Sequence, residues 1–392
     1  MNDLFAKKDN EYLSKKNRDI LKKIFHISMI VINIFVAVSL LLSYLCVVVH
    51  PITVWWIGLF GLAYLHLLVV NICFVVFWIF SDKKKMFVLS TAVILTGWPL
   101  LERNIQFFGK KLPESEKQNW NLKVISFNVQ GFTHRDALQP DGTWMNMFDF
   151  FDEKDADIIC MQEFSVFSWS DELNEENVHK QFYKTPYYHI AMTSFGPTGR
   201  HYKFGIATFS KYPIIRKKLI YSDSTTNACM YSDLVIGVDT VRVFNMHLKS
   251  VGFQNDDRLF LYNMIKTGYG KSDVRAVKSI IRQLSLAAFE RAKQVEIVNS
   301  HIQQSPYPVI VCGDFNDPPV SYSYQKVRGN RKDAFIESGS GLSNTFNIGR
   351  KAFLRIDFIM YSDVFKAYDY ESPRVFLSDH FPVMCRLVKR EK

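Results

Sequence analysis

The hydrophobic residues divide the chain into two unlike parts. Three long apolar runs without a charged residue occupy residues 25–49, 52–80 and 86–101. A helix needs about 20 mostly apolar residues to cross a bilayer, and the first two runs meet this length. The third run is shorter and contains Gly97 and Pro99, which predicts either a tilted span or an interfacial helix. We therefore expect an all-α transmembrane region of about three helices within residues 25–101.

Positive charges beside these runs predict the orientation of the region. Residues 1–24 form a basic N-terminus, and lysines at 83–85 separate the second run from the third. Because Lys and Arg beside short loops stay in the cytoplasm, both segments are expected inside. Three spans in a bacterial-type cell membrane then place the rest of the chain on the extracytoplasmic, periplasmic side, whereas two spans keep it inside. A cleaved signal peptide is the alternative, although no small-x-small pattern follows the first run.

A different pattern begins after a polar linker at residues 102–121. Within residues 122–392, short apolar runs rich in Val, Ile and Phe alternate with polar or helical stretches. The runs that predict buried strands are 123–129, 157–161, 204–209, 241–246, 309–312, 356–360 and 381–388. Apolar residues every three or four positions over 286–302 predict a helix with one packed face. This mixture predicts a single α/β or α+β sandwich domain.

The segment 253–282 differs from its surroundings because it is polar and basic. It is inserted between a predicted strand and the predicted helix. Long insertions are often solvated surface loops, but those beside a site are often functional. Both a surface excursion and a lid that faces the substrate are therefore consistent with this segment.

The net charge of +10 says little about the substrate. Residues 1–111 carry 13 Lys and Arg against 6 Asp and Glu, so +7 belongs to this part and only +3 to the rest. A nearly neutral domain disfavours tight, salt-sensitive binding of DNA. The six cysteines include no C-x-x-C pair, and we expect no disulfide framework.

Side chains suited to metal and proton chemistry lie at the ends of several predicted strands. The candidates at strand ends are Asn128, Glu163, His247, Asp314 and Asn316. Two more sets follow: Asp357 lies within an apolar run, and the pair Asp379 and His380 lies just before the last predicted strand. Strand ends converge at one edge of a layered α/β fold, so the candidates are expected to meet in one cleft. Each alone is more often a turn former or a structural histidine. Together they supply carboxylate, amide and imidazole groups that suit Mg²⁺ or Mn²⁺ with a phosphate substrate, and suit zinc poorly.

The local sequences around these candidates resemble the ordered motifs of the endonuclease/exonuclease/phosphatase (DNase I-like) superfamily. The matching segments are 126–129, 161–163, 245–248, 313–317, 355–358 and 378–382. The resemblance covers the chain from about Lys123 to its end, and the motifs occur in the order of the family. It implies a four-layer α/β sandwich with two central mixed β-sheets. The apolar N-terminal region is not part of this resemblance, although membrane-tethered bacterial members have a similar plan.

The resemblance also implies a role for each candidate. Glu163 is expected to be the principal metal ligand, with Asn128 and Asp379 close to the metal and phosphate. Asp314 is expected to position or deprotonate the attacking water, while Asn316 fixes the scissile group. The expected phosphate contact is His380, and Asp357 holds its imidazole in one tautomer.

For His247 the implied role is to stabilise the phosphoryl oxygens or to assist the leaving group. In the DNase-like branch a glutamate pairs with the matching histidine, whereas residues 202–205 offer no carboxylate. The catalytic tyrosine of the apurinic endonucleases is also not identified, which weakens the case for DNA repair. The role of His247 therefore differs from the family pattern.

These residues predict a membrane-anchored hydrolase of phosphodiester or phosphomonoester bonds. The expected mechanism is in-line attack by water, assisted by Mg²⁺ or Mn²⁺. The substrate is either a nucleic acid or a lipid headgroup, the second being a sphingomyelinase-like alternative. A catalytically silent membrane binding module of the same fold is the rival, although a degenerate site usually loses at least one ligand.

Overall fold

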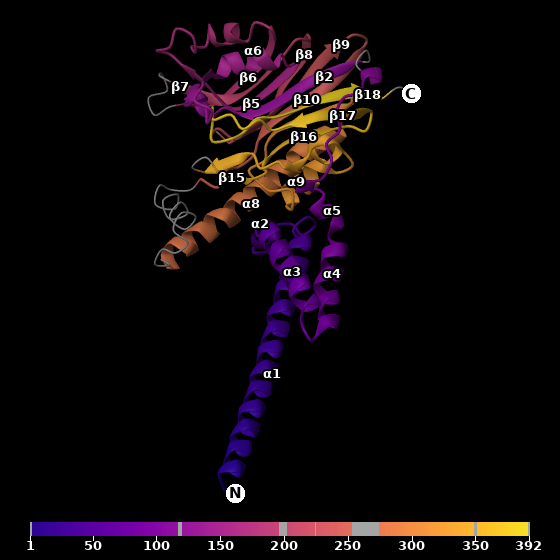
Figure 1. Ribbon diagram of the computed structural model, residues 1–392. Coiled ribbons are helices and arrows are strands. Elements are labelled where there is room, and N and C mark those ends of the chain that lie inside the picture. The colour runs from indigo at the N-terminus through magenta and orange to yellow at the C-terminus, as the bar shows by residue number, and fades with distance from the viewer. Residues whose placement is uncertain are drawn as a thin grey trace.

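The computed structural model describes residues 2–116, 120–195, 202–223, 225–252, 274–348 and 351–390 (Figure 1). Of the polar segment 253–282, residues 253–273 lie outside the described residues. Residues from 274 onward belong to helix α8 (Val274–Gln303). The helix is therefore longer than the 286–302 that periodicity predicts, because polar residues extend it beyond its packed portion.

Two six-stranded sheets form the centre of the domain. In spatial order, the first contains β17 (Phe365–Glu371), β18 (Val383–Lys389), β2 (Asn121–Asn128), β5 (Ile158–Phe167), β7 (Tyr202–Ser210) and β6 (Tyr187–Phe195). The second contains β12 (Lys332–Asp333), β16 (Asp357–Tyr361), β11 (Val309–Asp314), β10 (Asp239–His247), β9 (Ala228–Ile236) and β8 (Ile214–Ser222). Each sheet is mixed, since β2 pairs with β5 in parallel and β10 pairs with β11 in parallel, while the other pairs are antiparallel. All seven predicted strands lie in these sheets.

The two sheets pack face to face, and helices cover their outer faces. Alternate residues of β2 show this arrangement: Val124 belongs to the core between the sheets, and Ile125 to the core beneath α6 (Met147–Lys154). On the other sheet, α8 and α9 (Tyr322–Arg328) bury Val298 and Val327 against β10 and β11. Strands buried on both faces read as continuous apolar runs, which explains why the sequence identified them. The four layers confirm the predicted sandwich.

Short elements complete the domain. They are the pairs β1 (Ile105–Gln106) with β13 (Gly341–Leu342), β3 (Asp136–Leu138) with β4 (Trp144–Asn146), and β14 (Phe346–Ile348) with β15 (Lys351–Leu354), the helix α10 (Ala334–Ser338), and the 3₁₀ turns η2 (Glu114–Glu116), η3 (Gln130–Phe132) and η4 (Val178–Phe182).

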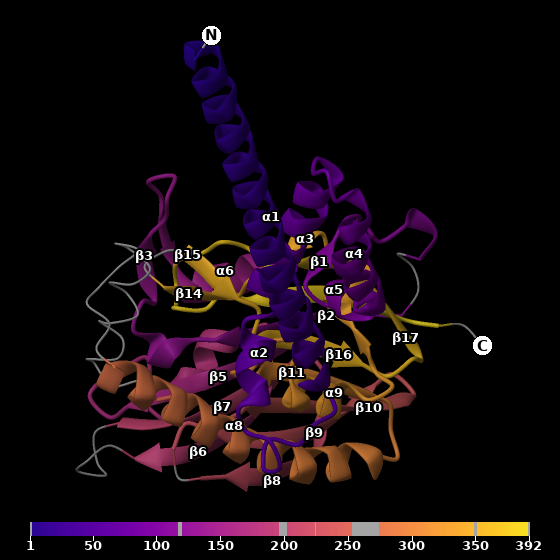
Figure 2. The ribbon, with the colours of Figure 1, turned by 90° about the horizontal axis from the view of Figure 1, so that it is seen from below.

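Five helices precede the domain and project from one of its faces (Figure 2). They are α1 (Asn2–Leu45), α2 (Ile57–Leu62), α3 (Tyr64–Ile79), α4 (Phe87–Thr96) and α5 (Trp98–Leu101), with the 3₁₀ turn η1 (Lys84–Met86) between α3 and α4. The second apolar run thus divides into α2 and α3, and the third divides at Gly97. Among the described residues, one helix, Lys15–Leu45, is long and apolar enough to cross a membrane, and α3 is apolar but shorter.

A buried polar network joins α1, α3 and α4. The Asn33 amide donates to the Ser90 hydroxyl at 2.6 Å and accepts from the Trp78 indole at 2.9 Å. The Ser90 hydroxyl in turn donates to the Asn71 side chain at 3.0 Å. All four side chains are fully buried. Such satisfied polar contacts between apolar helices favour one arrangement of the three helices over others.

The helical part contacts the domain directly beside the loop that follows β11. A Cβ on Gly61 would lie 2.4 Å from the carbonyl oxygen of Val320, so this close approach requires glycine. Arg103 donates to the carbonyl oxygen of Pro319 at 3.2 Å, and its own carbonyl accepts from Arg355 at 2.9 Å. Arg355 also forms a buried ion pair with Asp333 at 2.6 Å. The helices and the sandwich therefore share a packed joint.

Acid is expected to destabilise the domain through His189 on β6. Burial, with the charge of Lys217, lowers the pKa of this imidazole to about 4, against about 6.5 in an unfolded chain. The unfolded state therefore takes up the proton more readily. The contribution of His189 to the free energy of unfolding is fully present above pH 6.5 and is lost as the pH drops toward 4. The loss is roughly 3 kcal/mol at most. Thermal melts of the full-length protein in detergent should show a weaker pH dependence for His189→Gln, and identical pH slopes would contradict this expectation.

Candidate active site

The candidate residues converge at one end of the two sheets. Asn128 ends β2, His247 ends β10 and Asp314 ends β11, as the apolar runs predict. Asp314 on β11 lies opposite His247 of the neighbouring strand β10 and opposite Asp357 of the other neighbour, β16. The Asn128 amide donates to Asp314 Oδ2 at 3.1 Å and so connects the first sheet with the second.

Glu163 occupies a β-bulge, and this corrects its predicted place at a strand end. Strand β5 continues to Phe167, and its pairing with β7 shifts between Met161 and Phe164. Glu163 has a positive φ of 51° there. A bulge re-aims one side chain out of the strand's alternation, at a cost in backbone strain. The carboxylate consequently reaches the other candidates, where Asn128 donates to its Oε1 at 3.3 Å.

Asp314 occupies the centre of the cluster and is buried. Its Oδ1 accepts from the Asn316 backbone at 2.8 Å, and its Oδ2 accepts from the Asn316 amide at 3.3 Å. The same Oδ2 lies 3.6 Å from His247 Nε2 and 3.7 Å from His380 Nε2. Burial raises the pKa of Asp314, although both histidines oppose the shift. A desolvated carboxylate between two imidazoles is a suitable proton acceptor.

Gly313 makes this position of Asp314 possible. Its φ is 153°, and a Cβ there would lie 2.0 Å from the carbonyl oxygen of Met246 on the parallel neighbour β10. Any other residue would force β10 and β11 apart at the point where His247 and Asp314 face each other.

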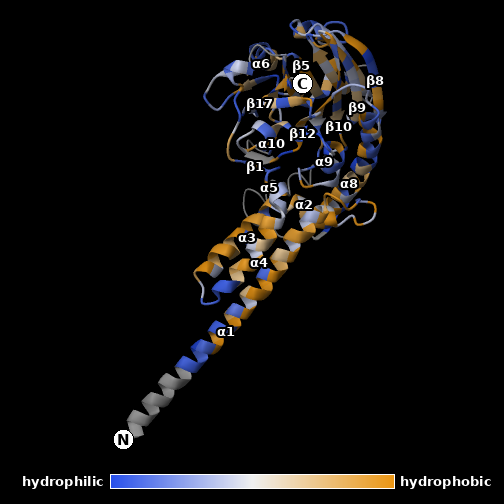
Figure 3. Ribbon diagram, turned by 90° about the vertical axis from the view of Figure 1, so that its right-hand side faces the viewer, coloured by the Kyte–Doolittle hydropathy of each residue, from blue (hydrophilic) through white to orange (hydrophobic). Residues whose placement is uncertain are grey.

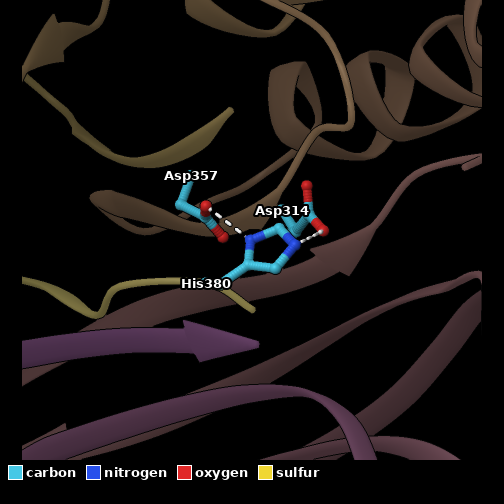
Figure 4. Close-up of side chains that lie close together, drawn as sticks. All are labelled: Asp314, Asp357 and His380. Atoms are coloured by element: carbon cyan, nitrogen blue, oxygen red, sulfur yellow. Dashed lines mark hydrogen bonds and ion pairs between the residues drawn. The ribbon is translucent and has the colours of Figure 1, made fainter. Parts of the chain in front are cut away.

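His380 and Asp357 form a buried pair beside Asp314 (Figure 4). The Nδ1 of His380 lies 2.9 Å from Asp357 Oδ2, which leaves Nε2 directed at Asp314. Burial disfavours the charged imidazole, but Asp357 and Asp314 outweigh it and hold the pKa of His380 well above its usual range. The arrangement keeps a cationic donor within the buried cluster.

His247 is oriented by the backbone rather than by a carboxylate. Its Nδ1 lies 3.0 Å from the carbonyl oxygen of Thr226, so the ring donates there and its Nε2 faces Glu163 and Asp314. That nitrogen is buried, has no hydrogen-bond partner among the described residues, and lies 3.7 Å from Glu163 Oε1. The orienting partner absent from residues 202–205 is thus supplied by a loop that no motif marks.

The oxygen donors around Asp379 suit a divalent cation. Burial raises the pKa of Asp379, and the charges of Glu163 and Asp314 add to this effect although His380 opposes it. Such uncompensated negative charge among hard oxygen donors fits Mg²⁺ or Mn²⁺. Among the residues described, Asp314, Asp357 and His380 form a group compact enough for metal binding. Asp357 is already bonded to His380, whereas Glu163, Asn128 and Asp379 offer further oxygen donors that fit a metal.

Several supporting residues were missed by the sequence analysis. Gln162 on β5 donates to Asn245 on β10 at 2.8 Å, and Asn245 donates to the Ala207 carbonyl at 2.8 Å. These buried amides hold the sheets together beside the cluster. The Ser378 hydroxyl donates to the Asn128 carbonyl at 2.7 Å and so places the segment that carries Asp379 and His380. Gln162, Asn245 and Ser378 all lie inside the recognised motif segments, which was the one available signal.

One comparison with known proteins identifies a family for the domain. The sequence model of the Endonuclease/Exonuclease/phosphatase family matches residues 125–380. A second sequence model, described as Domain of unknown function (DUF8431), matches residues 22–104. No curated protein matches the chain.

Similar solved structures include three bacterial proteins. An endonuclease/exonuclease/phosphatase from Beutenbergia cavernae DSM 12333 is 14% identical, with a TM-score of 0.48 over 69% of this chain and 72% of that chain. A family protein from Bacteroides thetaiotaomicron is 18% identical, with a TM-score of 0.47 over 70% of this chain and 100% of that chain. A mannosyl-6-phosphatase from Bacteroides thetaiotaomicron VPI-5482 is 18% identical, with a TM-score of 0.44 over 68% of this chain and 99% of that chain.

Proposed function

The chain belongs to the endonuclease/exonuclease/phosphatase family of phosphoester hydrolases, and on this premise we propose that it is a membrane-anchored, divalent-metal-dependent phosphoesterase. The observation that carries the proposal is the position of Asp314, a buried carboxylate within 3.7 Å of both His247 and His380. A binding module would have no need for a desolvated base beside a charged imidazole, since both are costly to bury.

The protein's own residues divide the work of an in-line displacement. Asp314 accepts a proton from the attacking water, and Asn316 fixes both that carboxylate and the scissile group. His380, charged and oriented by Asp357, donates a hydrogen bond to a phosphoryl oxygen. His247 stabilises the phosphoryl oxygens or the departing oxygen through Nε2. A cation held by Glu163, Asn128 and Asp379 would neutralise the charge that develops on the phosphoryl group.

Removal of divalent metal is expected to abolish turnover without unfolding the protein. The core clusters of the sandwich do not involve the three proposed ligands, so EDTA should leave the melting temperature nearly unchanged. Activity should return with Mg²⁺ or Mn²⁺ and not with Ca²⁺ alone, because Ca²⁺ prefers more ligands and longer distances. Full turnover in EDTA would contradict metal dependence.

The substrate of the enzyme can be identified with a panel of phosphoesters. Full-length protein in detergent should hydrolyse at least one phosphoester among DNA, RNA, sphingomyelin, glycerophospholipids and inositol phosphates, each assayed with Mg²⁺ and with EDTA. Val320, which Gly61 contacts, lies a few residues after Asn316, so the helices pack close to the catalytic loop. This closeness favours a lipid headgroup over a soluble polymer as the substrate. Failure to hydrolyse every member of the panel would reject the function.

The proposed anchor consists of α1, α3 and α4 as three spans. Helix α1 runs toward the domain, α3 runs away from it and α4 returns, so the N-terminus and the lysines at 83–85 lie on the side remote from the domain (Figure 1). Hydrophobic residues form a band between that side and the domain, and α1 becomes hydrophilic beyond the band (Figure 3). With basic segments inside, the domain lies on the extracytoplasmic side of the cell membrane.

Reporter fusions are expected to report this topology directly. Alkaline phosphatase, which is active only outside the cytoplasm, should be active when fused after residue 101 and inactive when fused after residue 83. A cytoplasmic fluorescent reporter should give the opposite result at both positions. Cytoplasmic activity of the fusion after residue 101 would reject the three-span topology.

A further inference from the structure

A groove of about 880 Å³ separates the end of α1 from the domain, away from the active site. Its walls come from the turn after α1, the last turns of α8, and α9 with the turn that follows it. Val309, which begins β11, lines the groove, whereas Asp314 ends the same strand. At about 3.3 Å per residue, the groove and Asp314 are separated by roughly 17 Å of strand.

The groove opens at the level where the helices leave the proposed bilayer, so the inference rests on the proposed membrane anchor. Val47 and Val48 line it and lie just after Leu45, the last residue of α1. The side chain of Val48 is 67% exposed. Trp55 and Trp56 follow in the same connection to α2 and are partly exposed, as is typical of residues at a membrane interface. The groove therefore faces the headgroups of the adjoining leaflet.

The chemistry of the groove is cationic. Arg331 donates from Nε to the Val327 carbonyl at 2.8 Å and from Nη2 to Asn299 Oδ1 at 3.3 Å. Within the described ranges no carboxylate pairs with it. Its neutral partners leave the charge uncompensated, and burial lowers the pKa of Arg331 to about 10. An anion in the groove would remove this cost.

The other charged residues of the groove are already paired. Lys326 lies 2.8 Å from Glu296, and Asp363 lies 3.2 Å from Arg390. The unbalanced charge is thus that of Arg331 alone, close to Asn299. An arginine fork with a neighbouring amide matches the oxygens of a phosphate group.

We propose that this groove binds the phosphate of an anionic phospholipid in the leaflet beside the domain. Arg331 and Asn299 contact the phosphate, while Val47 and Val48 lie along the glycerol backbone and the first methylene groups. The lipid at this site is a structural ligand and not the substrate. The groove lies at the beginning of β11, whereas Asp314 lies at the opposite end of that strand. Bound there, it fastens the domain to the membrane surface in one orientation.

The test uses full-length protein in nanodiscs of phosphatidylcholine, with and without phosphatidylglycerol. Wild type should melt at a higher temperature with phosphatidylglycerol and should retain that lipid in native mass spectrometry. Arg331→Gln should bind it about tenfold more weakly, because one charge-assisted contact is lost, and Arg331→Lys should retain part of the effect. The matched control is Arg216→Gln, an exposed arginine on β8 outside the groove, which should behave as wild type.

Three results would overturn the proposal. They are an unchanged phosphatidylglycerol response in Arg331→Gln, an equal loss in the Arg216→Gln control, and an equal rise in melting temperature when free glycerol 3-phosphate is added to phosphatidylcholine nanodiscs. If Arg331→Gln does not fold, Arg331→Lys decides, and an unchanged phosphatidylglycerol response in that variant rejects the groove. Phosphoesterase activity in the same nanodiscs reports separately on the catalytic proposal.

Discussion

Replacing Asp314 by asparagine is expected to lower kcat about 1000-fold, the range of a lost general base. The amide cannot accept a proton from water, yet it preserves the shape of the side chain. Asn316 and Asn128 still find an oxygen to bond, so the fold should survive. The measurement is kcat with the best substrate of the panel, together with a thermal melt and a metal-binding titration.

The matched control for this variant is Asp141→Asn. Asp141 lies in the exposed turn between β3 and β4, where it accepts hydrogen bonds from Thr143. It is remote from the cluster and should leave kcat unchanged. Activity of Asp314→Asn within a few fold of wild type would remove Asp314 from the mechanism.

His380→Ala is expected to abolish turnover to a similar degree, with at least about a 1000-fold loss of kcat. The variant removes a charged hydrogen-bond donor that two carboxylates hold in place, and it leaves Asp357 buried without its partner. Some loss of stability is therefore expected too. His179→Ala on η4, where the imidazole stacks on Tyr188, is the matched control and should keep wild-type activity.

Asp357 acts through His380, and a double-variant cycle can show this. Asp357→Asn should lower kcat about 100-fold with little change in KM, since the residue positions the imidazole and does not touch substrate. The double variant His380→Ala with Asp357→Asn should be no slower than His380→Ala alone. Additive losses would mean that Asp357 has a separate role.

Most of the sandwich could be predicted because its central strands are buried on both faces. Strands such as β2, β11 and β18 consist of nearly continuous apolar residues, which few other structures require. Strands β6, β8, β12 and β17 were missed, and each lies at a sheet edge. Residues 215–219 of β8, for example, are exposed and mostly basic. An edge strand pairs with a neighbour on one side only, and an exposed face leaves no hydrophobic signal in the sequence. The buried strand β9 was also missed, because Ser232 and Asp233 interrupt its apolar residues.

Recognition of the active-site residues had a similar limit. Asn128, His247 and Asp314 could be identified because they follow apolar runs, and Asp357, Asp379 and His380 because of their motif segments, but the geometry of the site could not be predicted. Glu163 reaches the cluster through a bulge in the middle of β5, and His247 is oriented by a backbone carbonyl of Thr226. Every residue has the same backbone carbonyl, so no sequence pattern predicts the contact between His247 and Thr226.

The sequence by itself determined the two-part plan, the layered fold and the set of side chains available for phosphoester chemistry, because burial and strand ends leave a periodic record along the chain. Only the tertiary structure decided which of those side chains meet. It placed Asp314 between His247 at the end of β10 and His380 in the segment before β18, and it joined the helices to the loop after Asn316. It also left Arg331, among the described residues, without a carboxylate partner in the groove that α9 lines. These relations depend on contacts between residues distant in the chain, and local patterns of polarity carry no information about such distances.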